Sequence, residues 1–551
     1  MNPLGLLSHA GRAKVILAVL ARHGFADLVN QLDLPAGFWK RLLVEPTTSH
    51  TLYERARLAA EELGPTFVKL GQFLSMRPDV LPQALILELR QLQDRVQPLP
   101  FAEIRPVLEE DLGRPLAEVF TDFDEQPAAS ASLAQVYFAR LRSTGADVAV
   151  KVQKPDLRRT MQIDLDLAVW LAGQLQQRLA ALQAIDLVGT VEDARRGVLR
   201  ELDFEHEARN QAYFNTLNPH PDRVFAPQVH TAHSSARVLV MARIAGTPVG
   251  RTELTPALRA QLAAHGAESI VRQILLAGFF HADPHAGNVL ITPDGRLCFL
   301  DWGLAGHLTR RLRYALADFW LAAVEQDADR IVQIALDLAP PDARPDLREM
   351  EKEVTLALRE ELNFAIGQQQ LGRAMLRLLY IFGRHGIPLS RDYALMAKAI
   401  LSLEEVGRTL DPDFDLRRHA KPVLQELYRE RHSPGAGLRR AREFMRSSLS
   451  SLQDLPAELH RLVRRLEHDN LTINLQHRGL ETHDDAMKVA ANRIALGVII
   501  GSLIIGSSLI IITGIEPHLF GYPALGIVGY LLSALLGLYV VWDIIRHGRH
   551  R

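Results

Sequence analysis

The sequence predicts an α+β protein that ends in a hairpin of two membrane-spanning helices. Two stretches near the C-terminus, residues 494–515 and 522–542, contain no charged side chain. Each exceeds the roughly 18 consecutive apolar residues that mark a spanning helix. In the middle of the chain, short apolar runs between turn residues predict strands, and long stretches of helical periodicity lie on both sides. With 551 residues the chain exceeds the usual size of one hydrophobic core, so two or three structural units are expected.

Composition and charge narrow the classes of function. Lysine and arginine total 63 and aspartate and glutamate 64, a net charge of −1, which gives no reason to expect a nucleic-acid partner. Cys298 is the only cysteine, so no intrachain disulfide and no metal site of several thiolates can form. This cysteine content is compatible with a reducing compartment. No secretory signal peptide is expected. Residues 12–29 fit either an organelle transit peptide or an amphipathic first helix of the mature protein, and the second interpretation is favoured.

The predicted hairpin also has a predicted orientation. Residues 516–521 connect the two spans and contain no lysine or arginine. Basic residues instead flank the outer ends: Lys488, Arg493, Arg546, Arg549 and Arg551. The positive-inside rule then places both ends, and the soluble body, in the cytoplasm or its organellar equivalent, and a multi-pass protein of the bacterial inner membrane is expected. The competing interpretation is a buried core hairpin of a soluble protein, which two successive apolar runs disfavour.

Small residues recur four apart in both spans. They are Gly497 and Gly501 in the first span and Gly529, Ser533 and Gly537 in the second. Small residues at this spacing let helices approach closely. Packing of the hairpin on itself is the favoured explanation, and association of two chains as a homodimer in the membrane is the alternative.

The most specific chemical motif is residues 281–288, with the sequence HADPHAGN. It follows an apolar helical pattern over 270–280 and precedes two short apolar runs, 289–291 and 297–300. Thr-Pro-Asp-Gly joins these runs, and proline followed by Asp-Gly is good turn chemistry, so they are predicted to form a β-hairpin.

The hairpin leads directly to Asp301-Trp302-Gly303. This layout resembles the catalytic loop of a protein kinase followed by its metal-binding turn. In that arrangement Asp283 meets the attacking oxygen, while Asn288 and Asp301 hold Mg²⁺, which prefers hard oxygen ligands. His285 is expected to support the loop through a hydrogen bond, and we assign it no catalytic role.

A matching upstream half is present. Residues 148–152 form an apolar strand pattern with a single lysine, Lys151, and another strand pattern over 135–141 precedes it. In a kinase fold this lysine holds the α- and β-phosphates of ATP and pairs with a helical glutamate. The candidate for that glutamate is Glu207, in the acidic helical segment 201–210.

Where a kinase has its glycine-rich loop, residues 127–134 have the sequence PAASASLA. The candidate nucleotide-binding positions in it are Ala129, Ser130, Ala131 and Ser132. Glycine lets backbone amides wrap phosphates without a Cβ in the way, so alanine and serine restrict the loop. Nucleotide is still expected to bind, with an altered phosphate geometry.

Together these features resemble the UbiB family, atypical kinase-like proteins linked to ubiquinone and other isoprenoid-quinone metabolism. The resemblance covers residues 20–320 by motif and the C-terminal hairpin by architecture. It implies a two-lobed, protein-kinase-like fold with a helical N-terminal extension.

Two further family motifs are present, KxGQ at Lys69 to Gln72 and ExD at Glu201 and Asp203. The resemblance implies that the KxGQ helix plugs the place where a protein substrate would bind. Lys69 and Gln72 would then face the active site near Glu201 and Asp203.

Two positions depart from the family pattern. Ala286 stands where proline is usual, and Ala242 stands where an acidic residue often occurs in the adenine-binding hinge. Hinge contacts come mainly from backbone groups, so adenine binding is compatible with this change. The sequence also lacks an activation segment ending in Ala-Pro-Glu, because a helical pattern over 309–325 follows Gly303 almost at once. Its absence, together with the implied plug, argues against ordinary protein phosphorylation.

The chain is predicted to divide into five regions. They are a helical N-terminal extension with the KxGQ motif (1–115), an N-lobe with a helical insertion (116–250), a helical C-lobe with the catalytic loop (251–415), a basic juxtamembrane region (416–490) and the transmembrane hairpin (491–545). Basic helices of the fourth region are equally compatible with binding to anionic lipid and with a solvated helix face.

The leading hypothesis is a membrane-anchored atypical kinase or ATPase that uses ATP and Mg²⁺ and supports ubiquinone biosynthesis. Its expected partners are membrane lipid, isoprenoid-quinone precursors and quinone-pathway enzymes. The alternative is a nucleotide-switched, pseudokinase-like scaffold for those enzymes, which the alanine-rich loop favours and the complete set of catalytic groups disfavours. An ordinary membrane-tethered protein kinase is a third, less favoured hypothesis.

Overall fold

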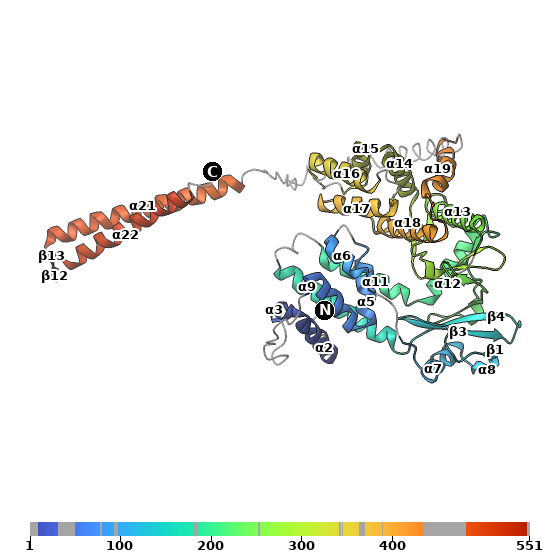
Figure 1. Cartoon of the computed structure of the whole chain (residues 1–551). Helices are drawn as coiled ribbons and strands as arrows, with labels where there is room; N and C mark the ends of the chain where they lie inside the picture. Colours follow the sequence, from blue (N-terminus) through green and yellow to red (C-terminus); the bar gives the residue numbers. More distant parts are fainter. Residues whose placement is uncertain are drawn as a thin grey trace, which may run out of the picture. The chain divides into compact units, whose positions relative to one another are not determined.

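The computed structural model describes residues 9–30, 50–77, 80–92, 97–179, 186–251, 254–340, 343, 345–362, 370–387, 389–433 and 481–547. The chain forms two compact units, Met1–Gly437 and Leu438–Arg551 (Figure 1). The first unit holds all the predicted site residues, and the second holds the two long apolar helices.

An antiparallel sheet forms the N-lobe of the first unit. Its strands are β1 (Phe120–Phe123), β2 (Ala129–Ser130), β3 (Ala134–Leu141), β4 (Asp147–Gln153) and β6 (Val238–Ala242). They follow the order β1-β3-β4-β6, and β2 pairs with the start of β3. The predicted strands over 135–141 and 148–152 therefore lie side by side, with Val150 opposite Tyr137.

Alternation along β4 decides where its lysine lies. Val148, Val150 and Val152 pack on one face of the sheet with helix α7 (Phe101–Leu112), and Ala149 packs on the other face with helix α12 (Phe204–Leu217). Successive side chains of a strand point to opposite faces, so Lys151 lies on the α12 face.

Helices that precede the sheet in the chain, or are inserted between β4 and β6, form a second layer of the first unit. They are α2 (Ala10–Leu20), the π-helical turn η1 (Ala21–Phe25), α3 (Ala26–Asn30), α4 (Leu52–Leu63), α5 (Pro65–Leu74), α6 (Gln83–Leu89), α8 (Leu116–Val119), α9 (Leu157–Arg178) and α11 (Leu187–Glu201). Ile16 and Leu17 of α2 pack with Leu167 of α9, and Arg12 forms an ion pair of 2.6 Å with the buried Asp164. These contacts support the interpretation of residues 12–29 as a helical part of the folded body.

The C-lobe combines short strands with a large helical core. Its elements are β5 (Val224–Phe225), η2 (Thr231–His233), β7 (Thr247–Pro248), α13 (Pro256–Arg272), the π-helical turn η3 (Gln273–Ala277), β8 (Phe279–His281), η4 (Ala286–Asn288), β9 (Val289–Ile291), β10 (Leu297–Phe299), β11 (Ala305–His307), α14 (Arg310–Glu325), α15 (Ala328–Leu338), α16 (Leu347–Glu361), α17 (Leu371–Arg384), α18 (Arg391–Leu410) and α19 (Leu416–His432). The predicted hairpin is present, because β9 and β10 pair antiparallel with Ile291 opposite Leu297.

The helical pattern predicted over 270–280 is wrong in its last residues. The helix ends at Ala277, and Gly278 turns the chain with φ +69°. Phe279 to His281 then form β8, which pairs with β11 and sets Phe280 opposite Gly306. A Cβ on Gly306 would collide with the ring of Phe280, so this pairing requires glycine. Pairing with a distant strand thus overrides the local helical pattern.

The second unit contains helices α21 (Glu481–Thr513) and α22 (Ala524–His547), which pack against each other and are joined through the short strands β12 (His518–Leu519) and β13 (Tyr522–Pro523) (Figure 1). Apolar spans of 20 and 19 residues, Ile494–Thr513 and Ala524–Trp542, have mean hydropathies of 2.5 and 2.2. Only 6% and 11% of the most apolar windows are buried, unlike the core helices of a soluble protein. The predicted fold class, including the helical hairpin, is confirmed.

Only some of the predicted small residues pack the hairpin. Of the predicted residues, Gly529 allows the close approach, since a Cβ there would collide with Ser507. Gly526, which is not among the predicted residues, does the same, since a Cβ there would meet Ile511. Within the described part of the chain, a Cβ on Gly497, Gly501 or Gly537 would meet nothing within 4 Å.

Candidate functional site

The centre of the site is an ion pair between the sheet and α12. Lys151 Nζ lies 2.8 Å from both carboxylate oxygens of Glu207 and 3.5 Å from Asp301 Oδ2. Burial favours the neutral form of the amine, but the carboxylates of Asp301 and Glu207 face it, so the pKa of Lys151 is raised. Burial in turn raises the pKa of Glu207 to about 7, against the opposing effect of Lys151. The ammonium also lies 5.2 Å from the centre of the Phe204 ring. The structure thus brings together the lysine and the glutamate that the sequence paired.

Asp301 is fixed by its own turn. Its Oδ1 accepts a hydrogen bond of 2.9 Å from the amide of Gly303. Burial opposes ionisation of this carboxyl, but Lys151 and the Gly303 amide outweigh it, and the pKa of Asp301 is lowered. The carboxylate is therefore ionised at neutral pH and suited to a divalent cation.

Trp302 anchors the turn of residues 301–303 in the hydrophobic core. The indole is buried, stacks on Phe214 at 4.5 Å between ring centres and on Phe279 at 5.9 Å, and donates to the carbonyl of Phe299. Asn210 of α12 donates to the carbonyl of Trp302. The position of Asp301 is therefore coupled to α12, the helix that carries Glu207.

The catalytic loop is built on a buried, neutral histidine. His281 is fully buried, and burial lowers its pKa to about 4, so its Nδ1 can accept a hydrogen bond of 3.0 Å from the amide of Asp283. Asn288 donates from Nδ2 to the carbonyl of Asp283 at 3.3 Å, a bond that does not use the amide oxygen needed for a metal. His285 accepts from the amide of Gly287 and caps η4, which is a supporting contact of the predicted kind.

The alanine-rich loop forms the tight turn between β2 and β3. Ala129 lies opposite Val136, and the amide of Ala131 donates to the carbonyl of Ala134. The hydroxyl oxygens of Ser130 and Ser132 are buried, and neither has a hydrogen-bond partner among the described residues. Buried hydroxyl groups normally find partners, so two unpartnered ones in a loop of this position fit the oxygens of a phosphate group.

The KxGQ helix reaches the site through one side chain. Lys69 Nζ of α5 lies 2.5 Å from Glu201 Oε1, and the two side chains are only 11% and 22% exposed. Gln72 does not share this contact, because its amide donates to the carbonyl of Leu92 at 3.1 Å. The hydrogen bonds of the described chain therefore connect Lys69, and not Gln72, to the ExD motif.

The ExD motif lies at a break between two helices. The acidic segment 201–210 was predicted as one helix, but α11 ends at Glu201 and α12 begins at Phe204. Asp203 caps α12, since its carboxylate accepts from the amide of Glu205 at 3.1 Å. Asp203 therefore caps α12, and Glu201 is the residue of the motif that pairs with Lys69.

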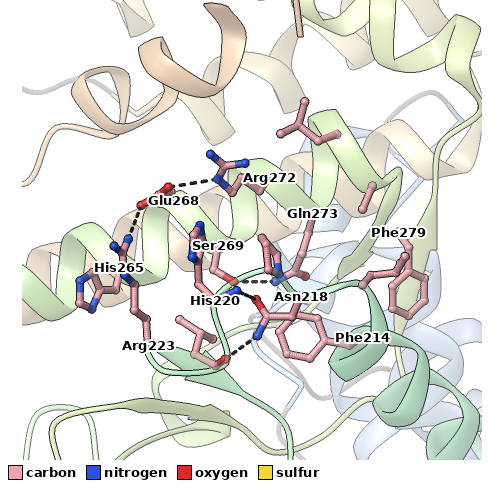
Figure 2. Close-up of a pocket in the computed structure, with 15 residues that line it drawn as sticks. Phe214, Asn218, His220, Arg223, His265, Glu268, Ser269, Arg272, Gln273 and Phe279 are labelled. Carbon is pink, nitrogen blue, oxygen red and sulfur yellow. Dashed lines mark hydrogen bonds and ion pairs between the residues drawn. The ribbon is translucent and has the colours of Figure 1, made fainter. Parts of the chain in front are cut away.

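A cavity lies next to the site, and Figure 2 shows the side chains around it. Its volume is about 250 Å³, and Phe214 and Phe279, the two rings that stack on Trp302, line it. Gln273, also in its wall, accepts a hydrogen bond of 2.9 Å from the amide of His281. The cavity therefore lies next to residues that hold the catalytic loop in place, and Asp283 is not among the residues that line it.

Sequence reasoning missed one residue of the site. Lys398 of α18 forms an ion pair of 3.1 Å with Asp283 Oδ2. The available signal was a single lysine among the apolar residues of 393–403, and that pattern alone does not indicate its partner.

Three family models match the chain. An ABC1 atypical kinase-like domain matches residues 91–335, a UbiB helical domain matches residues 360–415, and an ABC1/UbiB kinase-like C-terminal domain matches residues 478–546. The matched ranges contain the N-lobe and catalytic loop, helices α17 and α18, and the apolar hairpin.

Similar proteins come from several bacteria. The "Probable protein kinase UbiB" of Aeromonas salmonicida is 33% identical over 89% of this chain and 92% of its own. A Clostridium pasteurianum protein described as an uncharacterized protein in the hydrogenase 1 5' region is 28% identical over 98% and 99%. Among solved structures, the Rv3197–erythromycin complex of Mycobacterium tuberculosis matches with a TM-score of 0.44 and 25% identity over 57% of this chain and 80% of the other.

Proposed function

This chain belongs to the ABC1/UbiB family of atypical kinase-like proteins, and on that premise we propose that it is a membrane-anchored enzyme that uses Mg-ATP to support isoprenoid-quinone biosynthesis. The observation that carries the proposal is the cluster of Lys151, Glu207 and Asp301, whose charged groups lie 2.8 to 3.5 Å apart. The role in quinone biosynthesis is inferred from membership of the family, whereas the Mg-ATP chemistry is inferred from the residues of the site.

Each residue of the cluster has a role that its geometry supports. Lys151, which faces Asp301 and Glu207, holds the α- and β-phosphates, and the hydroxyl groups of Ser130 and Ser132 bind phosphate oxygens. Asp301 and the amide oxygen of Asn288 are the metal ligands. When bound there, Mg²⁺ would neutralise phosphate charge that builds up during transfer.

Asp283 orients the attacking hydroxyl or water and accepts its proton. Its backbone is held on both sides, through its amide by His281 and through its carbonyl by Asn288. Such a residue contributes mainly by positioning, which is the larger part of catalysis in phosphoryl transfer.

Ordinary protein phosphorylation is not part of the proposal. Only a short connection that contains strand β11 separates Gly303 from α14, which Thr309 caps through its hydroxyl. The hydrogen bond between Leu308 and Gly278 fixes this connection. No peptide-docking segment lies in it, and the ion pair of Lys69 with Glu201 holds α5 beside the site.

The membrane assignment is also a proposal. We assign Ile494–Thr513 and Ala524–Trp542 as spans, with the soluble body on the cytoplasmic side of a bacterial inner membrane. Helix α19 begins the predicted basic region 416–490, and its Arg431 pairs with Asp318 at 2.9 Å within the folded body, so any contact with anionic lipid falls to other basic residues of the region. The remainder of that region, residues 434–480, lies outside the described residues.

The test is ATP hydrolysis by the full chain in nanodiscs that contain anionic lipid. Asp301→Asn removes the ionised metal ligand and should lower turnover by about 10²-fold or more. Asp294→Asn is the matched control, since Asp294 lies in the exposed turn of the adjacent hairpin and pairs with Arg296. Equal turnover in Asp301→Asn and the wild type would refute the assignment.

The same experiment distinguishes the proposed enzyme from the alternative, a nucleotide-switched scaffold. Tight Mg-nucleotide binding with no turnover, in lipid and with a phenolic quinone-precursor mimic, would favour a nucleotide-switched scaffold. The alanine-rich turn supports this second function, because Ala129 and Ala131 replace the glycines that let backbone amides wrap phosphates.

A further inference from the structure

Helix α18 connects the catalytic loop to the KxGQ helix. Lys398, in its middle, reaches Asp283 at 3.1 Å, and α18 packs on η4 and β11 on either side of the loop. Arg391, at its start, lies over the ring of Phe73 on α5 at 4.9 Å. The helix belongs to the range that matches a UbiB helical domain, so this domain contributes a side chain to the proposed site.

The position of Lys398 is fixed by its helix. The residues around it, Met396, Ala397, Ala399 and Ile400, are at most 1% exposed. Lys398 itself is 35% exposed and Asp283 is 30% exposed, so the pair lies at an opening that solvent and a substrate can reach. A helix that is otherwise buried around Lys398 therefore presents one long cation to an accessible carboxylate.

The charges of the site show what Lys398 adds. Lys69 faces Glu201, and Lys151 faces Glu207. The catalytic loop has no cation of its own between Asp283 and Asn288, because the four residues there are Pro-His-Ala-Gly. In the described part of the chain, the ion pair with Lys398 is the only one that Asp283 makes.

We propose that Lys398 is a catalytic residue that binds the transferred phosphoryl group beside Asp283. The proposal rests on the function proposed above. In the reaction, the acceptor oxygen bonds to the γ-phosphorus, the bond from that phosphorus to the bridging oxygen of ADP breaks, and the acceptor's proton passes to Asp283. The ammonium group of Lys398 faces the oxygens on which negative charge is spread during the transfer.

The test compares binding of two nucleotides by the full chain in nanodiscs. Lys398→Met keeps the length of the side chain and removes its charge. It should weaken Mg-AMP-PNP, which has a γ-phosphoryl group, by about tenfold and leave Mg-ADP unchanged. Turnover should fall by about 10²-fold. Lys398→Arg should restore part of the Mg-AMP-PNP affinity and part of the turnover, because arginine returns the positive charge with a different shape.

Lys421→Met, an exposed lysine on α19, is the matched control and should change neither quantity. A merely structural role for Lys398 would weaken both nucleotides equally, and a restraining role would raise turnover in Lys398→Met. Either result overturns the proposal, as does an unchanged ratio of the two affinities. If the wild type binds nucleotide without turnover, the proposed enzymatic function fails, while the affinity ratio still decides whether Lys398 contacts the γ-phosphate.

Discussion

Replacing Lys69 by methionine should release α5 from the site. The ion pair with Glu201 is short, 2.5 Å, and its side chains are 11% and 22% exposed, between a solvent-exposed pair and a fully buried one. Exposed pairs contribute up to about 1 kcal/mol, and loss of one partner of a buried pair costs about 3 to 5 kcal/mol. An intermediate cost of about 2 kcal/mol is therefore expected for Lys69→Met. Since 1.4 kcal/mol is a factor of ten, local opening of α5 should become about 30-fold more frequent.

Amide hydrogen exchange measures this opening directly. Exchange over residues 65–74 should accelerate about 30-fold in Lys69→Met, while α7, which packs on the far face of the sheet, keeps its rate. Lys352→Met, an exposed lysine on α16, is the control. Adding Glu201→Gln to Lys69→Met should cost less than the sum of the single changes, because the second change removes the carboxylate left unpaired. Unchanged exchange in α5, or equal acceleration in every segment, would refute the reasoning.

Three further predictions follow from the described contacts. Ser132→Ala removes a buried hydroxyl that has no hydrogen-bond partner among the described residues, and it should weaken Mg-ADP binding several-fold without lowering the melting temperature. Calorimetry and a thermal scan can check the two quantities together. Gly306→Ala places a Cβ against the ring of Phe280 and should lower the free energy of unfolding by about 2 kcal/mol, with Gly64→Ala, where only positive φ opposes the change, as comparison. Burial raises the pKa of Glu404 to about 7, above its ordinary value of 4.5, despite hydrogen bonds from the amides of Leu371 and Gly372. The folded protein then binds the extra proton between these two pH values, so stability should fall by about 3 kcal/mol as pH rises from 4.5 to above 7. Glu404→Gln should remove that part of the pH dependence in denaturant titrations, and an identical dependence in both proteins would contradict the assignment.

The sequence by itself determined the features that depend on neighbouring residues. The motif of 281–288, the turn Thr-Pro-Asp-Gly and the runs on either side predicted the hairpin of β9 and β10, because turn chemistry and strand alternation are local. The two apolar spans followed from length and composition alone. Alternation along β4 also placed Lys151 on the same face as Ala149 and on the opposite face from Val150, so its face was set once the strand was known.

Tertiary structure decided the contacts between distant segments. Periodicity shows that a helix buries one face, but it does not show which element covers that face or where a long side chain at its edge ends. The sequence therefore could not indicate that Lys398 meets Asp283, or that Gln72 donates to Leu92 and not to the ExD motif. Likewise, the strand at Phe279 depends on a partner elsewhere in the chain, β11, whose pairing outweighs the local helical preference.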